Sequence, residues 1–139
     1  MIDERSLIRF ERVKLLVRDE RRAAVVRAED SVRGAEAELA RREAAHDGDV
    51  QAFQRLDLVT ADELELCARA LAASRTRRVS ASEALAAARA SRTEVEVLRV
   101  DAERETRGLE LARVRLVRVR RDRQERAEQQ LVELRSGRR

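Results

Sequence analysis

The sequence contains no proline, tryptophan or tyrosine, and only two phenylalanines in 139 residues. A compact globular domain of this length normally needs aromatic side chains to fill its core. Charged residues make up 42% of the chain, which leaves little apolar volume for such a core. Because proline is the strongest helix breaker, its absence allows helices to run long.

Cysteine, histidine and glycine are also scarce. The single cysteine, Cys67, excludes an intrachain disulfide. The four glycines are scattered along the chain and cannot form a phosphate-binding loop. The one histidine, His46, lies beside Asp47 and Asp49, but this spacing matches no known metal-ligand pattern. We therefore predict no catalytic, cofactor or metal site, and no enzymatic activity.

No apolar run approaches the length of a membrane span. The opening residues, Met1-Ile2-Asp3-Glu4-Arg5, lack the apolar core of a signal peptide. We expect a cytoplasmic protein.

Alanine, leucine, glutamate and arginine dominate the sequence, as they do in long helices and coiled coils. No segment alternates apolar and polar residues with the period of a strand. The pattern predicts an all-α protein with one domain. We expect two long helices in an elongated antiparallel coiled-coil hairpin, with the C-terminal helix the longer.

The first helix is predicted over residues 3–46, and its apolar stripe is Phe10, Val13, Val17, Ala24, Ala28, Val32, Ala35 and Leu39. Gly48 suits a helix C-terminus, and Asp49 suits the N-cap of a following turn. We therefore expect a connection over residues 47–60 that contains a short helical turn. Asp49, Phe53 and Leu56 would then lie at the tip of the hairpin.

The second helix is predicted over residues 61–135, because Thr60 and Glu63 match a capping box. Its middle carries a seam of small residues: Leu64, Cys67, Leu71, Ser74, Ala81, Leu85, Ala88 and Val95. Its later seam is Leu98, Ala102, Glu105, Leu109, Ala112, Leu116 and Val119. A second apolar set lies beside that seam: Val97, Val100, Leu111, Val114 and Val117.

The second helix is too long to be covered by the first. If the turn lies near residue 53, the unpaired overhang is on the order of 40 Å, and a turn near residue 59 would reduce it to roughly half. The unpaired part would carry exposed apolar residues, which usually mark a partner-binding site.

The overhang is also basic. Residues 1–69 carry a net charge of −3 and residues 70–139 carry +7. Seven arginines lie between Arg113 and Arg126. Such a helix can bind nucleic acid, acidic membrane or an acidic protein surface, or its arginines can simply be solvated.

Two of these partners fit the residues less well. Apolar residues interrupt the arginines, unlike the uniformly basic block of a leucine-zipper DNA-binding protein. No aromatic side chain lies among these arginines to stack on bases. An amphipathic membrane-surface helix is disfavoured by the absence of tryptophan and by the many acidic residues. We expect neither nucleic acid nor a membrane span as a partner.

Three features resemble the FliJ/YscO/HrpO stalk proteins of bacterial type III secretion and flagellar export. They are the opening Ile2–Val17 segment, the expected break at His46–Asp49 and the arginine-rich end. The resemblance covers the whole chain in length and pattern, but this family has no diagnostic motif to align. It implies a non-enzymatic central stalk whose termini insert into a hexameric ATPase. It also implies that the hairpin tip contacts the export gate or escort chaperones, at the periphery of the inner membrane.

From unpaired apolar and basic surface we expect the ATPase-binding residues to be Ile2, Leu7, Ile8, Phe10, Leu111, Arg113, Val114, Val117, Arg118, Arg120 and Arg121. A different function fits the same pattern. A generic coiled-coil adaptor or escort chaperone could self-associate through the overhang and form a homodimer.

Overall fold

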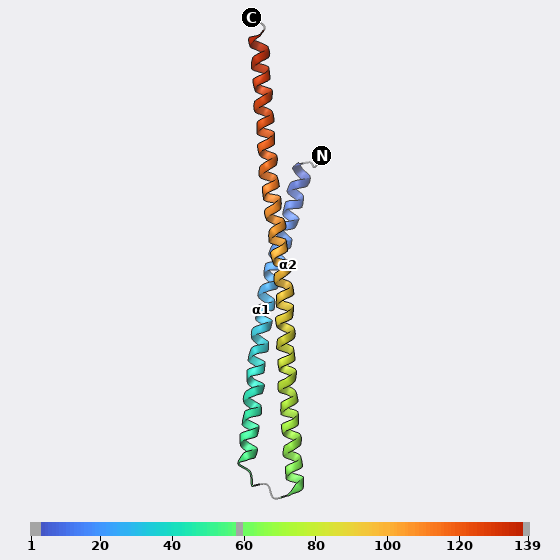
Figure 1. Cartoon of the computed structure of the whole chain (residues 1–139). Coiled ribbons are helices and arrows are strands. Elements are labelled where there is room, and N and C mark those ends of the chain that lie inside the picture. Colours follow the sequence, from blue (N-terminus) through green and yellow to red (C-terminus); the bar gives the residue numbers. More distant parts are fainter. Residues whose placement is uncertain (1–3, 58–59, 138–139) are drawn as a thin grey trace. The chain divides into compact units, whose positions relative to one another are not determined.

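The protein is described here from a computed structural model, which places residues 4–57 and 60–137. This part of the chain contains two helices, α1 (Glu4–Gln54) and α2 (Ala61–Ser136), and no strand. The two helices pack against each other, and α2 is the longer, with 76 residues against 51 (Figure 1). Within these residues, neither helix has a segment long and apolar enough to cross a membrane.

Helix α1 runs straight through the predicted break at His46–Asp49 and ends only at Gln54. The predicted short turn after Asp49 is therefore the end of α1 itself. Gly48 has a negative φ and sits in open space. A glycine inside a helix costs about 1 kcal/mol relative to alanine, which is too little to end a helix that has Ala44, Ala45 and Ala52 close by on its two sides.

The ends of the helices follow local rules. At the start of α2, the Glu63 amide donates to the Thr60 hydroxyl at 3.3 Å, and the Thr60 amide donates to the Glu63 carboxylate at 3.0 Å. This confirms the predicted capping box. At the other end, the Gly137 amide donates to the Glu133 carbonyl at 2.9 Å, so α2 ends within a residue of its predicted end.

The contacts divide the chain into two compact units. We call residues 20–99 the central unit and residues 1–19 with 100–139 the terminal unit. Each unit contains a piece of α1 and a piece of α2.

The central unit is held by a narrow seam of small residues. On α2, Ser74, Ala81 and Leu85 are buried, with 6%, 8% and 7% of their surface exposed. On α1, half-buried residues face this seam: Ala24, Ala28, Val32, Ala35, Leu39, His46 and Phe53. These observations confirm the predicted stripes here, except that Leu64 is exposed.

Polar contacts accompany the seam in the central unit. His46 Nδ1 lies 3.2 Å from the Ser74 hydroxyl. Arg89 pairs with Glu36 at 3.0 Å and Arg92 with Glu29 at 3.2 Å. Glu29 is half-buried and the other three charged side chains are exposed, so each pair contributes at most about 1 kcal/mol.

Two half-buried carboxylates have lowered pKa values because arginines donate hydrogen bonds to them. The Arg42 guanidinium lowers the pKa of Glu38, and the Arg99 guanidinium lowers that of Glu96. A carboxylate with a lowered folded-state pKa adds stability above its unfolded pKa, and this contribution is lost as the pH falls through the folded value. These groups therefore act as fixed negative charges at neutral pH.

Replacing Gly48 with alanine tests the uninterrupted helix. We expect Gly48→Ala to stabilise the protein by about 1 kcal/mol, because the position is helical and an added Cβ meets nothing within 4 Å. Thermal unfolding followed by circular dichroism at neutral pH measures this. A destabilised variant would mean that the chain turns at Gly48.

A pair of leucine substitutions tests the seam. We expect Leu85→Ala to destabilise the protein by about 2 kcal/mol, because Leu85 is buried and its removal leaves a partly filled space. Leu66→Ala is the matched control on the same helix, since Leu66 is 70% exposed, and it should change stability by less than about 0.5 kcal/mol. Urea unfolding compares the two variants, and equal effects would rule out the observed packing.

Candidate partner-binding surface

The terminal unit is held by a seam whose α1 side is half charged. Its half-buried α1 residues are Leu7, Ile8 and Leu15 together with Glu11, Lys14 and Arg18. Leu7, Glu11, Lys14 and Arg18 follow one another at steps of four, three and four. Opposite them on α2, Ala102 and Thr106 are buried, at 8% and 2% exposed. Small residues on α2 leave room for the long aliphatic stems of charged α1 side chains, whose polar ends reach solvent.

Polar groups in this seam are satisfied by specific partners. The Thr106 hydroxyl donates to the Ala102 carbonyl at 2.8 Å. Lys14 Nζ contacts a Glu105 carboxylate oxygen at 2.6 Å and lies 5.4 Å from the centre of the Phe10 ring. Arg113 pairs with Glu11 at 3.3 Å, and the Glu11 side chain is only 14% exposed. These contacts bring together three charged residues that sequence analysis did not select as partner-binding residues: Glu11, Lys14 and Glu105.

The predicted apolar stripe of α1 was wrong in the terminal unit. Phe10, Val13 and Val17 are 50%, 54% and 39% exposed and flank the seam. The reason is that the small residues on α2 accommodate Glu11, Lys14 and Arg18 in the seam. The apolar side chains are thereby left on the surface, where Leu16 joins them at 70% exposed.

The prediction of the later seam of α2 was only partly correct. Ala102 is buried, and Leu109 and Leu116 are half-buried. The other four predicted members are exposed: Leu98, Glu105, Ala112 and Val119. The seam differs from the prediction at one step, where Thr106 lies at the contact in place of Glu105. The residues of α2 at the contact are therefore Ala102, Thr106 and Leu109.

The second apolar set on α2 is mostly exposed. Leu111, Val114 and Val117 are 60%, 65% and 57% exposed, as is Val97 at 55%, whereas Val100 is half-buried. Within the terminal unit, an open groove is lined by Glu11 of α1 and by Glu110, Arg113, Val114 and Val117 of α2. Two valines and three charged residues of both signs line it, which suits an amphipathic helix as a ligand.

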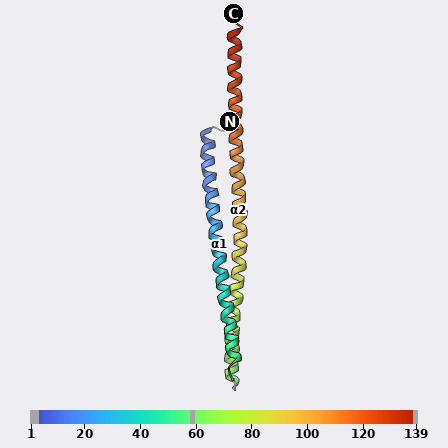
Figure 2. The same ribbon diagram turned by 90° about the vertical axis from the view of Figure 1, so that its left-hand side faces the viewer.

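Beyond Leu116, α2 continues as an exposed helix. Leu116 is the last half-buried residue, and every described residue after it is exposed. Figures 1 and 2 show this red end of α2 projecting past the N-terminal end of α1 in both views. We call residues 117–136 the α2 extension. At about 1.5 Å per residue it spans roughly 30 Å, between the two lengths expected from the sequence.

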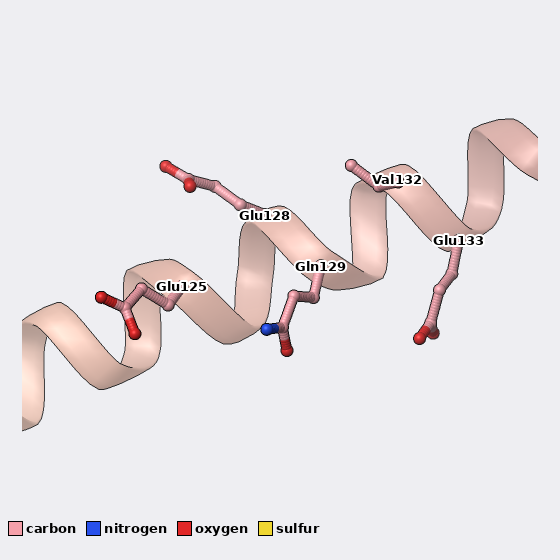
Figure 3. Close-up of a pocket in the computed structure, with 5 residues that line it drawn as sticks. All are labelled: Glu125, Glu128, Gln129, Val132 and Glu133. Carbon is pink, nitrogen blue, oxygen red and sulfur yellow. The ribbon is translucent and has the colours of Figure 1, made fainter.

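The α2 extension carries charged and apolar side chains together. Val117, Val119, Leu131, Val132 and Leu134 are all between 47% and 69% exposed. Arg121 pairs with Glu125 at 2.8 Å along the same helix. Figure 3 shows Glu125, Glu128 and Glu133 projecting from one stretch of helix, with no second element opposite them.

The structure places the predicted site residues as follows. Leu7 and Ile8 are half-buried near the start of α1, and Ile2 lies outside the described residues. Phe10 is exposed. The α2 members are also exposed: Leu111, Arg113, Val114, Val117, Arg118, Arg120 and Arg121. Most of the predicted set therefore lies at the surface of the terminal unit.

The predicted tip residues are less well gathered. Asp49 and Phe53 are half-buried in the last turns of α1, and only Leu56 lies in the connection, where it is 53% exposed. Asp49 is inside the helix and does not act as an N-cap. Among the described residues, no group of three or more histidine, cysteine or acidic side chains is placed to hold a metal ion.

A signal for the polar seam was present in the sequence. Leu7, Glu11, Lys14 and Arg18 continue backwards the same four-three spacing that Val25, Ala28, Val32, Ala35 and Leu39 follow in the central unit. Extending that register past Arg21 would have placed the charged residues at the contact.

Comparison with known proteins finds no matching family model, no matching curated protein and no matching solved structure.

Hydrogen exchange tests the exposed extension. At low protein concentration we expect backbone amides of residues 117–136 to exchange far faster than those around Ala81 and Leu85, because no second helix covers them. Mass spectrometry of peptic fragments reports both regions in one experiment. Equal protection of the two regions would show that α2 beyond Leu116 is covered.

Proposed function

We propose that the two helices form an antiparallel coiled-coil hairpin that serves as the central stalk of a bacterial type III secretion ATPase complex. The α2 extension is the observation that carries this proposal. It presents exposed valines and leucines together with arginines, in the same unit as the exposed Phe10, Val13 and Val17. Exposed apolar surface of this kind is usually covered by a partner.

The hairpin part of the proposal rests on contacts inside each unit. In the terminal unit, Glu11 contacts Arg113 while Lys14 contacts Glu105. In the central unit, Glu29 contacts Arg92 while Glu36 contacts Arg89. Within each unit, the residue numbers of the α2 partners decrease as the residue numbers on α1 increase, as antiparallel helices require. Half-buried residues at four-three steps support coiled-coil packing.

In this function the α2 extension and the start of α1 would enter the pore of the hexamer. Arginines on the extension would be attracted to acidic groups or carbonyl oxygens of the pore, and the exposed leucines and valines would pack against its apolar walls. The ATPase would carry out the chemistry, and this chain would couple its conformational states to the export gate. Leu56, exposed in the connection, is the residue we assign to contact with the gate or with secretion chaperones. In the cell the protein would be cytoplasmic and would reach the inner membrane through the secretion apparatus.

A coiled-coil adaptor or escort chaperone is the second candidate. The open groove between Glu11, Val114 and Val117 favours it, because such a groove fits an amphipathic helix of a client protein. The two functions differ in whether the chain changes the turnover rate of an ATPase.

ATP turnover of a hexameric type III secretion ATPase tests the stalk. We expect the full chain to stimulate turnover and a truncation after Leu116 to lose most of that stimulation, because the extension would make the pore contacts. Arg118→Gln combined with Arg120→Gln should raise the concentration of the chain needed for half-maximal stimulation by roughly tenfold, since these arginines would be desolvated in the pore.

The matched control removes two charges elsewhere on α2. Arg75→Gln combined with Arg77→Gln alters exposed residues of the central unit and should leave stimulation unchanged. If neither the full chain nor the truncation changes ATP turnover, the result would contradict the stalk function and favour the adaptor function.

A further inference from the structure

Charges of opposite sign are separated along the α2 extension. Residues 117–124 contain four arginines and one aspartate, whereas residues 125–134 contain three glutamates and one arginine. All of these side chains are exposed. The acidic part is the surface drawn in Figure 3, where Glu125, Glu128 and Glu133 stand free of any second element.

This separation selects a partner. A second extension aligned in the same direction would place arginines against arginines and glutamates against glutamates. The opposite direction places the basic part of each copy against the acidic part of the other. Charge complementarity of this kind sets orientation and register in helix pairs, and here the chain itself supplies both surfaces.

We propose that the α2 extension pairs with the α2 extension of a second copy of this chain, in antiparallel orientation and centred between Glu125 and Arg126. The contact face follows a four-three spacing along the helix. Its members are Val117, Arg120, Gln124, Ala127, Leu131 and Leu134.

The centre of this pairing defines its contacts. Val117 faces Leu134 of the second copy, and Gln124 faces Ala127 of the second copy. At the edge of the face, Arg121 lies beside Glu128 of the second copy, and twofold symmetry repeats this ion pair on the other side of the centre. Both side chains project into solvent in the single chain, and the Arg121 side chain is 79% exposed.

The composition of this face sets the strength of the dimer. Apolar residues occupy its two ends, while Arg120 and Gln124 lie toward its centre. Polar residues in a helix seam specify register at a cost in affinity. The overlap covers only about three heptads, so the dimer should be weak and reversible. The pairing does not depend on the ATPase, although both would occupy the same residues.

The test is a charge exchange in the full-length protein, with mass followed against concentration by sedimentation equilibrium. We expect the unmodified chain to dimerise. Arg121→Glu alone and Glu128→Arg alone should each raise the dimer dissociation constant by roughly tenfold, because each turns two attractive pairs into repulsive ones. An equimolar mixture of the two variants should dimerise again, since the glutamate introduced in one variant then meets the arginine introduced in the other.

The mixture distinguishes two reasons for a weaker dimer: loss of the ion pairs between the copies and damage to the helix itself. Arg121→Glu also removes the intrahelical pair with Glu125, but a damaged helix would not recover when a second variant is added. Arg126→Glu is the control. It makes the same charge change about half a helical turn away from Val117, and it should leave the dissociation constant within about twofold of the unmodified value.

Three results would overturn the proposal: a chain that stays monomeric at all concentrations, a dimer unaffected by Arg121→Glu, and a mixture that fails to recover. Because no ATPase is present in these measurements, such a failure would leave the stalk function untouched.

Discussion

The narrow seam between α1 and α2 is the constraint on which the rest of this structure depends. Its most buried residues are small: Ser74, Ala81, Ala102 and Thr106, with Leu85 the one large side chain among them. Two helices that meet through such residues bury little apolar area, so each part of the seam contributes little free energy. The structure is held by many weak contacts spread along both helices.

A seam this narrow leaves apolar side chains exposed. In the terminal unit the charged residues Glu11, Lys14 and Arg18 share the α1 side of the contact with Leu7, Ile8 and Leu15. Phe10, Val13 and Leu16 remain at the surface. Charged residues at a contact lower its stability relative to leucines but tolerate separation and water. The terminal unit thus combines a weakly held seam with an uncovered apolar surface, which suits a segment that changes partners.

The α2 extension adds a second uncovered surface to that of the terminal unit's seam. A helix with no partner is marginal in water, so its order depends on what binds it. Its arginines precede its glutamates along the helix, and valines and leucines are interspersed among them. A basic, apolar helix can enter a larger assembly, and the same charge order makes it complementary to itself. The two proposals therefore describe competing uses of one surface, with free ATPase favouring one and high concentration of the chain favouring the other.

The sequence by itself determined what depends on near neighbours. The absence of strands from the described residues, the start of α2 at the Thr60–Glu63 capping box and the end of α2 near Ser136 all follow from residues within a few positions of each other. Only the tertiary structure decided which face of each helix is buried. Both Phe10-Val13-Val17 and Leu7-Glu11-Lys14-Arg18 have helical spacing, and the choice between them depends on Ala102 and Thr106, far away in the chain. The continuation of α1 through Gly48 was decided in the same way, because the cost of one glycine is small beside the partial burial of Val50 and Phe53 that a longer α1 allows.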